Sequence, residues 1–214
     1  MTENPSMRHF DTHPARMPAN TRLYGRRVLL RPLVPPDFEA WSEVRHRNHD
    51  WLTVWEPQRL AHLPDPTYVR DAFVSRCSQR DRERQNGVAY AYGLFVDGDF
   101  AGEVNLNTVH RGAFMSATIG YWIDELHAGC SYIPEGVVVL MRHSFEDLGL
   151  HRLEICIVPR NHNSRRVMDK LAIREEGVSL RFLEIDGVWE DHVRYAITAE
   201  EWEQRRDALA RQWL

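Results

Sequence analysis

Hydrophobic residues along most of this chain fall into short runs that alternate or cluster, and polar turns separate the runs. Alternating apolar and polar positions are typical of a strand with one buried face, whereas an apolar residue every three or four positions is typical of a helix. On this basis strands are predicted at 26–34, 88–96, 99–109, 116–123, 151–159, 181–185 and 188–197, and helices at 35–48, 65–84, 133–148, 163–172 and 198–214.

Two of the breaks between strands are tight Asp-Gly turns, at Asp97-Gly98 and Asp186-Gly187. An Asp-Gly pair between two apolar runs is a strong hairpin signal. The helix at 133–148 instead joins two separate strands, which indicates a strand–helix–strand crossover. The pattern therefore predicts an α/β fold with a central mixed sheet of about seven strands, flanked by helices.

The turn that leads into this crossover helix, His127–Ser131, carries almost no charge. The helix itself has an apolar stripe typical of packing on a sheet. Its first turn has free N–H groups at the positive end of the helix dipole, and such an end binds phosphate well. Pro134 falls where the helix requires no N–H. The turn is thus a candidate pyrophosphate site, and an ordinary strand–helix connection is the alternative.

Composition narrows the class of protein. The chain has 214 residues, 43% of them hydrophobic, without an apolar run of the roughly 20 residues that a membrane span needs. A net charge of −4 argues against nucleic-acid binding, and three cysteines form no even disulfide framework, so a reducing cytoplasm is expected. Residues 1–21 are predicted to be a flexible tail without a signal peptide, and residues 22–214 a single domain.

Four segments resemble the GNAT acetyltransferase superfamily, and within it the RimJ/RimL-like ribosomal-protein N-terminal acetyltransferases. The matching stretches are GEVNLN, IGYWIDELHAG, YIPEGVVVLMRHSFEDLGLHRLEICIVPRNHNS and KLAIREEGVSLRFLEIDGVWEDHVRYAIT. The resemblance extends over about 26–197 and implies a GNAT fold with acetyl-CoA as cosubstrate and no metal. It implies transfer of acetyl to the α-amino group of a protein N-terminus, such as that of a ribosomal protein, by a monomer or homodimer.

Two other functions remain open at this point. One is a GNAT enzyme that acetylates a small-molecule amine. The other is a non-catalytic CoA-binding module, because the family's pyrophosphate motif is poorly matched. That motif falls on 128–133, where Ala128 replaces Gln or Arg, Ser131 replaces Gly, and Ile133 replaces Gly or Ala. Serine still caps a helix start, so we expect acetyl-CoA binding to be kept.

The resemblance also implies which residues form the site. The expected cofactor-binding residues are Trp122, Ile123, Ala128, Gly129, Cys130, Ser131, Tyr132, Ile133, Asn161, Asn163 and Ser164. Backbone amides at the end of the strand before Asp124 are expected to meet the oxyanion. Trp55 is expected to line the acceptor groove. Ala172 replaces a helix-ending glycine and is expected to adopt a left-handed conformation.

Two side chains are predicted to be catalytic. Glu184, three residues before the hairpin glycine, matches the family's base, and Ser164 in the N-x-x-S match is the candidate acid for the leaving thiolate. A free α-amine has a pKa of about 7.7–8.0, so a modest base acting through water suffices. The structural alternative for Glu184 is a solvated edge carboxylate, and the alternative for Ser164 is a helix cap. The other candidate bases are Glu103, Glu190 and Asp191. Glu103 lies beside Asn105 and Asn107 on one strand, and the face that it occupies is expected either to line the same cleft or to be an exposed polar strand face.

Several features are interpreted as structural. His46 and His49 lack the further ligands that a metal site needs, and the charged run 76–85 is interpreted as a solvated helix face. Cys130 is interpreted as a small filler rather than a nucleophile. Trp51, Trp122 and Trp189 are expected in the core or cleft wall.

Overall fold

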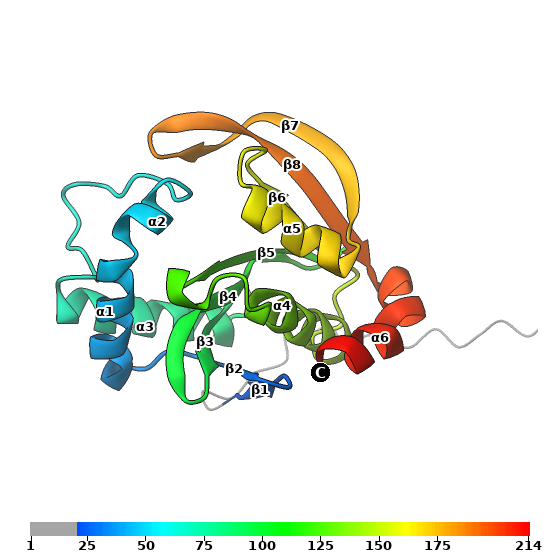
Figure 1. Ribbon diagram of the computed structural model, residues 1–214, viewed down its shortest axis with the longest axis horizontal. Helices are drawn as coiled ribbons and strands as arrows, with labels where there is room; N and C mark the ends of the chain where they lie inside the picture. Colours follow the sequence, from blue (N-terminus) through cyan, green and yellow to red (C-terminus); the bar gives the residue numbers. More distant parts are fainter. Residues whose placement is uncertain (1–20) are drawn as a thin grey trace, which may run out of the picture.

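An eight-stranded mixed sheet runs through the computed structural model, which describes residues 21–214 (Figure 1). The tail predicted for 1–21 thus lies, apart from its last residue, outside the described residues. The strands lie in the order β1-β2-β3-β4-β5-β6-β8-β7, and each neighbouring pair is antiparallel except β5 and β6. Their bounds are β1 Leu23–Tyr24, β2 Val28–Arg31, β3 Tyr90–Val96, β4 Asp99–His110, β5 Ser116–Ile123, β6 Arg152–Ile157, β7 Arg174–Ile185 and β8 Val188–Thr198.

Helices cover both faces of this sheet. Those described are α1 Phe38–Arg47, α2 His49–Thr53, α3 Arg70–Gln85, α4 Tyr132–Arg142, α5 His162–Leu171 and α6 Ala199–Trp213. Helices α1 and α3 contact β4 and β3, while α4 contacts β2, β4 and β5 as well as α5 and α6. The predicted crossover is confirmed, because α4 joins the parallel strands β5 and β6. The eighth strand is β1, a two-residue strand that the apolar pattern does not reveal.

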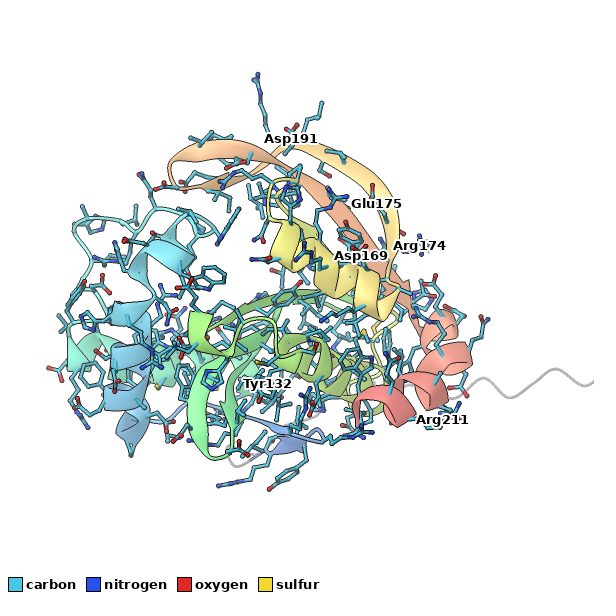
Figure 2. The ribbon with its side chains drawn as sticks, viewed as in Figure 1. Tyr132, Asp169, Arg174, Glu175, Asp191 and Arg211 are labelled. Atoms are coloured by element: carbon cyan, nitrogen blue, oxygen red, sulfur yellow. The ribbon has the colours of Figure 1, made fainter. Side chains whose placement is uncertain are left out.

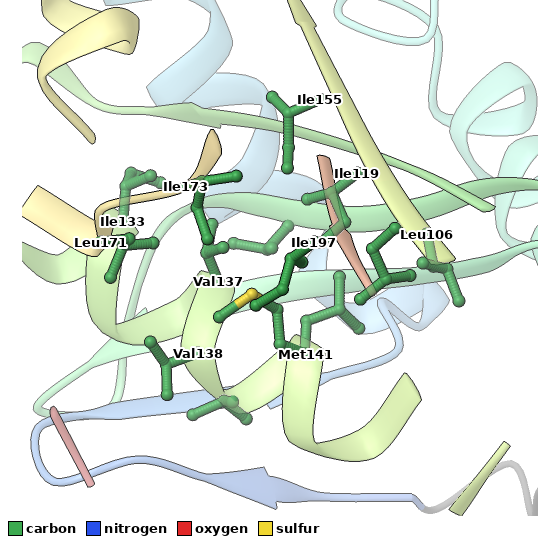
Figure 3. Packing of buried hydrophobic residues seen from close by; sticks show 14 of the residues in the cluster. Leu106, Ile119, Ile133, Val137, Val138, Met141, Ile155, Leu171, Ile173 and Ile197 are labelled. Atoms are coloured by element: carbon green, nitrogen blue, oxygen red, sulfur yellow. The ribbon is translucent and has the colours of Figure 1, made fainter. Parts of the chain in front are cut away.

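The main core forms between α4 and the sheet (Figure 3). Val137, Val138 and Met141 of α4 are at most 1% exposed and belong to the same cluster as Ile119 of β5. Gly136 lets the helix approach closely, since a Cβ there would lie 3.1 Å from Leu94 Cδ1. Packing of this apolar stripe on the sheet thus fixes the position of α4 and of its first turn.

The structure corrects three expectations. Helix α3 begins at Arg70 rather than near Asp65, because the Asp65 carboxylate accepts a hydrogen bond from Thr67 N at 2.8 Å and forms a local turn instead. The charged run 76–85 is not solvated throughout, since Arg84 is 3% exposed. Trp189 is neither core nor cleft wall and is 64% exposed.

Strand β7 is also longer than predicted. It begins at Arg174 rather than Arg181, and residues 174–179 of it are mostly exposed. This polar stretch lacks an apolar alternation, and its pairing with β8 makes it a strand. The expected left-handed conformation of Ala172 is confirmed by a φ of 47°. Among the described residues, no helix has the length and apolar character needed to cross a membrane.

Candidate active site

The sheet opens where β5 and β6 stop pairing. Their parallel register runs only from Ser116 with Arg152 to Thr118 with Glu154, although β5 continues to Ile123. Such a separation leaves backbone groups of β5 unpaired inside the sheet, and these groups need another partner.

Pairing on the other side of β5 shows which backbone groups face this gap. Asp124 N donates to Ala101 O at 2.8 Å, so alternate residues of β5 direct their backbone groups toward β4. Tyr121 and Ile123 therefore direct theirs toward the gap. Consistent with this, Ile123 O accepts a hydrogen bond from Trp51 Nε1 at 3.1 Å. The gap thus presents amide donors at the end of β5.

A cleft of about 1520 Å³ passes through the separation of the strands. One end is formed by the start of α4 and by α5, and the other by α1, α2, the loop 54–69 and polar residues of β4. The lining includes Trp51, Trp55, Tyr68, Glu103, Asn105, Asn107, Tyr121, Trp122, Ser131, Tyr132, Asn163, Ser164, Arg166 and Lys170. Two different groups of elements therefore meet in one cavity.

The turn before α4 has the backbone shape that a glycine would ordinarily supply. Ser131 is the N-cap of α4 and has a φ of 65°, in the left-handed region, and Gly129 has a φ of 79°. The Ser131 hydroxyl accepts a hydrogen bond from Lys170 Nζ at 2.7 Å. Serine thus adopts the conformation expected of the glycine it replaces, at a strain cost of about 1 kcal/mol.

A buried carboxylate ties this turn to β2. Glu135 is 1% exposed and accepts hydrogen bonds from Val28 N at 3.0 Å and from Arg27 Nε at 2.9 Å. Arg27 also donates from Nη1 to Cys130 O at 3.1 Å and lies 4.8 Å from the centroid of the Tyr132 ring. Figure 2 shows Tyr132 at the start of α4. The Arg27 contacts fix the turn through the carbonyls of Cys130 and Ser131, so they leave the amides of these two residues available.

Helix α5 adds positive charge at the same end of the cleft. Arg166 and Lys170 lie four residues apart, so they share one face of α5, and both line the cleft. A helix N-terminus with two cations beside it is suited to an anion such as a pyrophosphate.

Ser164 is held by two neighbours in the cleft wall. Its backbone N donates to Asn161 Oδ1 at 3.0 Å, which caps α5, and its hydroxyl lies 2.8 Å from the Tyr121 hydroxyl. Burial raises the pKa of Tyr121 more than the hydrogen bond with Ser164 lowers it. Tyr121 is therefore a neutral phenol that can donate to Ser164. The interpretation of the N-x-x-S segment as a helix cap is correct for Asn161.

Glu103 lies in the wall of the acceptor end. It is 2% exposed and accepts hydrogen bonds from Trp41 Nε1 at 2.7 Å, Arg76 Nη2 at 2.7 Å and Asn105 Nδ2 at 3.2 Å. Burial alone would raise the pKa of Glu103, but the Arg76 charge and these hydrogen bonds outweigh it and lower the pKa. Glu103 is thus a stably ionised carboxylate.

Asp124 anchors the end of β5 to α1. It is fully buried and accepts hydrogen bonds from Arg47 and, at 2.7 Å, from Asn48 Nδ2. Burial opposes ionisation, yet the hydrogen bonds from Arg47, Asn48 and Leu126 N lower the pKa of Asp124 to about 2. This anchor holds the amides of β5 against the helices of the acceptor end.

The β7–β8 hairpin closes over the acceptor end. Asp186 N donates to Glu56 O at 2.9 Å, and Arg45 holds Glu56 with two hydrogen bonds of 2.6 and 2.7 Å. The Glu184 carboxylate accepts from Gly187 N, inside the hairpin turn, and from Gln58 N at 3.3 Å. Glu184 therefore braces this closure, and it is not among the residues that line the cleft.

The remaining candidate bases lie elsewhere. Glu190 is paired with Arg160, and that hydrogen bond lowers the pKa of Glu190. Asp191 accepts a hydrogen bond from Arg181 N at 2.8 Å and lies on the outer side of the hairpin in Figure 2. Of the four carboxylates considered, Glu103 is the one that lines the cleft.

The structure brings most of the predicted cofactor residues to one cavity. Trp122, Ile123, Ala128, Gly129, Ser131, Tyr132, Ile133, Asn161, Asn163 and Ser164 all line the cleft. Cys130 does not, and its side chain is exposed. Sequence reasoning missed the roles of Tyr121, Arg166 and Lys170. The i, i+4 spacing of the two basic residues on a predicted helix was an available signal for the last two.

Comparisons with known proteins agree with this geometry. A family model described as an acetyltransferase (GNAT) domain matches residues 27–174. The probable N-acetyltransferase YjcK of Bacillus subtilis is 32% identical over 184 residues, which cover 85% of this chain and 99% of that protein. The [ribosomal protein uS5]-alanine N-acetyltransferase of Escherichia coli is 28% identical over 185 residues, covering 85% and 92%.

Solved structures give the same result. Mycobacterium smegmatis RimJ in complex with CoA-disulfide superposes with a TM-score of 0.80 at 32% identity, covering 89% of this chain and 95% of that one. The ribosomal-protein-S5-alanine acetyltransferase of Vibrio fischeri has a TM-score of 0.76 at 23% identity, covering 86% and 99%, and supports the fold.

Proposed function

Since this chain belongs to the GNAT acetyltransferase family and is an N-acetyltransferase that uses acetyl-CoA, we propose that its acceptor is the α-amino group of a protein N-terminus. A ribosomal protein is the proposed class of acceptor, because the E. coli relative is a uS5-alanine N-acetyltransferase. We place the reaction in the cytoplasm, where ribosomal proteins are made.

The through-sheet cleft is the observation that carries this proposal. The end formed by α4 and α5 offers helix-start amides, Arg166 and Lys170, which suit the phosphates of acetyl-CoA. The other end is lined by Trp51, Trp55 and Tyr68 with asparagines of β4. An acceptor of several residues fits such an end better than a single small amine does, because aromatic and amide side chains can follow an extended peptide.

The departures from the family's pyrophosphate motif are compatible with acetyl-CoA binding. Ser131 adopts the left-handed backbone that the replaced glycine would adopt, and its hydroxyl is occupied by Lys170. A Cβ at Gly129 would meet nothing within 4 Å, so the turn has open space beside it. These features remove the motif mismatch that favoured a non-catalytic module.

The chemistry requires a neutral amine and a stabilised thiolate. About a tenth of an α-amine is neutral at pH 7, so weak assistance by a carboxylate through water suffices. We assign that assistance to Glu103 ahead of Glu184, since Glu103 lines the cleft while Glu184 holds the hairpin turn. Because its pKa is lowered, Glu103 acts as a fixed negative charge that orients the water and not as the final proton acceptor. Tyr121 N and Ile123 N, which face the gap, are the proposed donors to the oxyanion, and Ser164 is the proposed donor to the sulfur.

A panel of acceptors tests the proposal. Purified protein with acetyl-CoA is offered peptides with free N-termini, the same peptides with blocked N-termini, and small amines including a polyamine and an aminoglycoside. We expect CoA release with the free peptides at a kcat/KM at least tenfold above that of any small amine. Preference for a small amine would replace the proposed acceptor. Acetyl-CoA binding without transfer to any acceptor would favour the module.

A further inference from the structure

The hydroxyl pair of Tyr121 and Ser164 is built into the cleft wall more tightly than a helix cap requires. Asn161 already caps α5 by accepting from Ser164 N at 3.0 Å, so the cap does not need the serine hydroxyl. That hydroxyl instead lies 2.8 Å from the phenol oxygen of Tyr121, which comes from a different element, β5. Both residues line the cleft.

Tyr121 also supplies the backbone that faces the gap between β5 and β6. Its N–H is directed away from β4, whereas its side chain reaches across to the start of α5. One residue therefore connects the strand that would bind the thioester carbonyl to the hydroxyl that would face the sulfur. The N-x-x-S pattern identifies Asn161 and Ser164 and gives no role to Tyr121.

We propose that Tyr121 is a positioning residue that donates a hydrogen bond to Ser164 Oγ and thereby directs the serine proton at the sulfur of CoA. The inference rests on the proposed role of Ser164. A serine hydroxyl is far less acidic than a thiol, so it does not give its proton up to the thiolate and acts as a hydrogen-bond donor. The proton that the amine nitrogen loses balances the one that the thiolate gains on leaving as CoA thiol.

Hydrogen bonds in a chain polarise one another, so a donor behind Ser164 makes its own O–H a better donor. The phenol has one proton. If the phenol proton pointed to Ser164 O, which lies 3.3 Å away, the serine proton would turn toward Tyr121. The serine hydroxyl would then no longer donate to the sulfur. The two arrangements predict opposite effects of removing the phenol, which makes the inference testable.

Bound CoA gives a test that needs no acceptor. The ultraviolet absorbance of the CoA thiolate is titrated against pH in complexes of CoA with the wild type, Tyr121→Phe and Ser164→Ala. We expect the thiol to ionise at lower pH in the wild type than in either variant, with similar affinity for CoA. Tyr92→Phe is the matched control, since its buried hydroxyl bonds His143 3.2 Å away and it is not part of the cleft lining.

The rate of acetyl transfer gives the second test. We expect Tyr121→Phe to lower single-turnover acetyl transfer about tenfold with less than a twofold change in either KM, and to have no further effect in a Ser164→Ala background. The inference is overturned if the CoA thiol titrates identically in the wild type and Tyr121→Phe, or if Tyr121→Phe slows the Ser164→Ala enzyme further. A wild type that binds CoA but acetylates no N-terminus would contradict the proposed function, and the thiol titration would still decide the role of Tyr121.

Discussion

The two ends of the cleft are built in different ways. The end proposed for the cofactor comes from two short stretches, the turn 128–133 with the start of α4 and residues 161–170 of α5, and it relies on backbone amides. The acceptor end takes side chains from α1, α2, α3, β4 and the loop 54–69, and it relies on partly buried charge pairs. We infer that the first end follows from local sequence and the second from the complete fold.

This difference predicts that a substitution at the acceptor end lowers the free energy of unfolding before it lowers the affinity for acetyl-CoA. Glu103→Leu would leave the Arg76 guanidinium and Trp41 Nε1 without their acceptor in a buried place. We expect the free energy of unfolding to fall by about 3 kcal/mol, measured by urea denaturation.

Glu43→Leu is the control, because Glu43 pairs with Arg47 on the exposed face of α1 and should contribute about 0.5 kcal/mol or less. Equal losses for the two variants would show that the Glu103 network does not support the acceptor end.

Acid should loosen the link between the two ends. The pKa of Asp124 is lowered from 3.8 to about 2 in the folded protein, so its stabilisation is complete above pH 4 and is lost as the pH falls through 2. The loss amounts to about 2 kcal/mol. Denaturation measured between pH 5 and pH 2 should show a steeper decline for the wild type than for Asp124→Asn. Parallel declines would contradict this account.

The cofactor end should tolerate substitution without unfolding. Replacing Arg166 and Lys170 together by alanine is expected to weaken acetyl-CoA binding about tenfold, or about 1.4 kcal/mol, with little change in the melting temperature. Calorimetric titration measures the affinity. Arg206→Ala on the exposed side of α6 is the control and should bind as the wild type does. Unchanged affinity in the double variant would remove these residues from the phosphate site.

The smallest effect is expected at the turn itself. Ser131→Gly should relieve left-handed strain and raise the free energy of unfolding by about 1 kcal/mol. Ala172→Gly, at a second left-handed position outside the cleft, should raise it similarly. Only Ser131→Gly should also change acetyl-CoA affinity. Equal affinities in the two variants would show that the serine has no part in binding.

The same contrast explains what the sequence could and could not predict. The crossover β5–α4–β6 and the turn before α4 follow from apolar periodicity and helix-start chemistry, which are local. Asn161 and Ser164 were found through a short motif. The burial of Arg84, the tie between Asp124 and α1, and the position of Glu184 in a hairpin brace depend on residues far away in the chain, so no local pattern encodes them.

The choice of a base between Glu184 and Glu103 illustrates the limit of prediction from sequence. The family resemblance predicts Glu184 as the base, whereas its Oε1 accepts a hydrogen bond from Gly187 N within the turn. Glu103 appeared equally compatible with an exposed strand, and the structure instead buries it among Trp41, Arg76 and Asn105. Alternation predicts to which face of a strand a side chain points, but it does not predict which elements pack on that face.

The most direct test of the proposed acceptor uses one peptide that carries both kinds of amine. A peptide with a free N-terminal alanine and an internal lysine is incubated with the protein and acetyl-CoA, and fragmentation mass spectrometry locates the acetyl group. Our account predicts a single acetyl group on the α-amino nitrogen. Acetylation of the lysine side chain instead, or none while acetyl-CoA is bound, would contradict it.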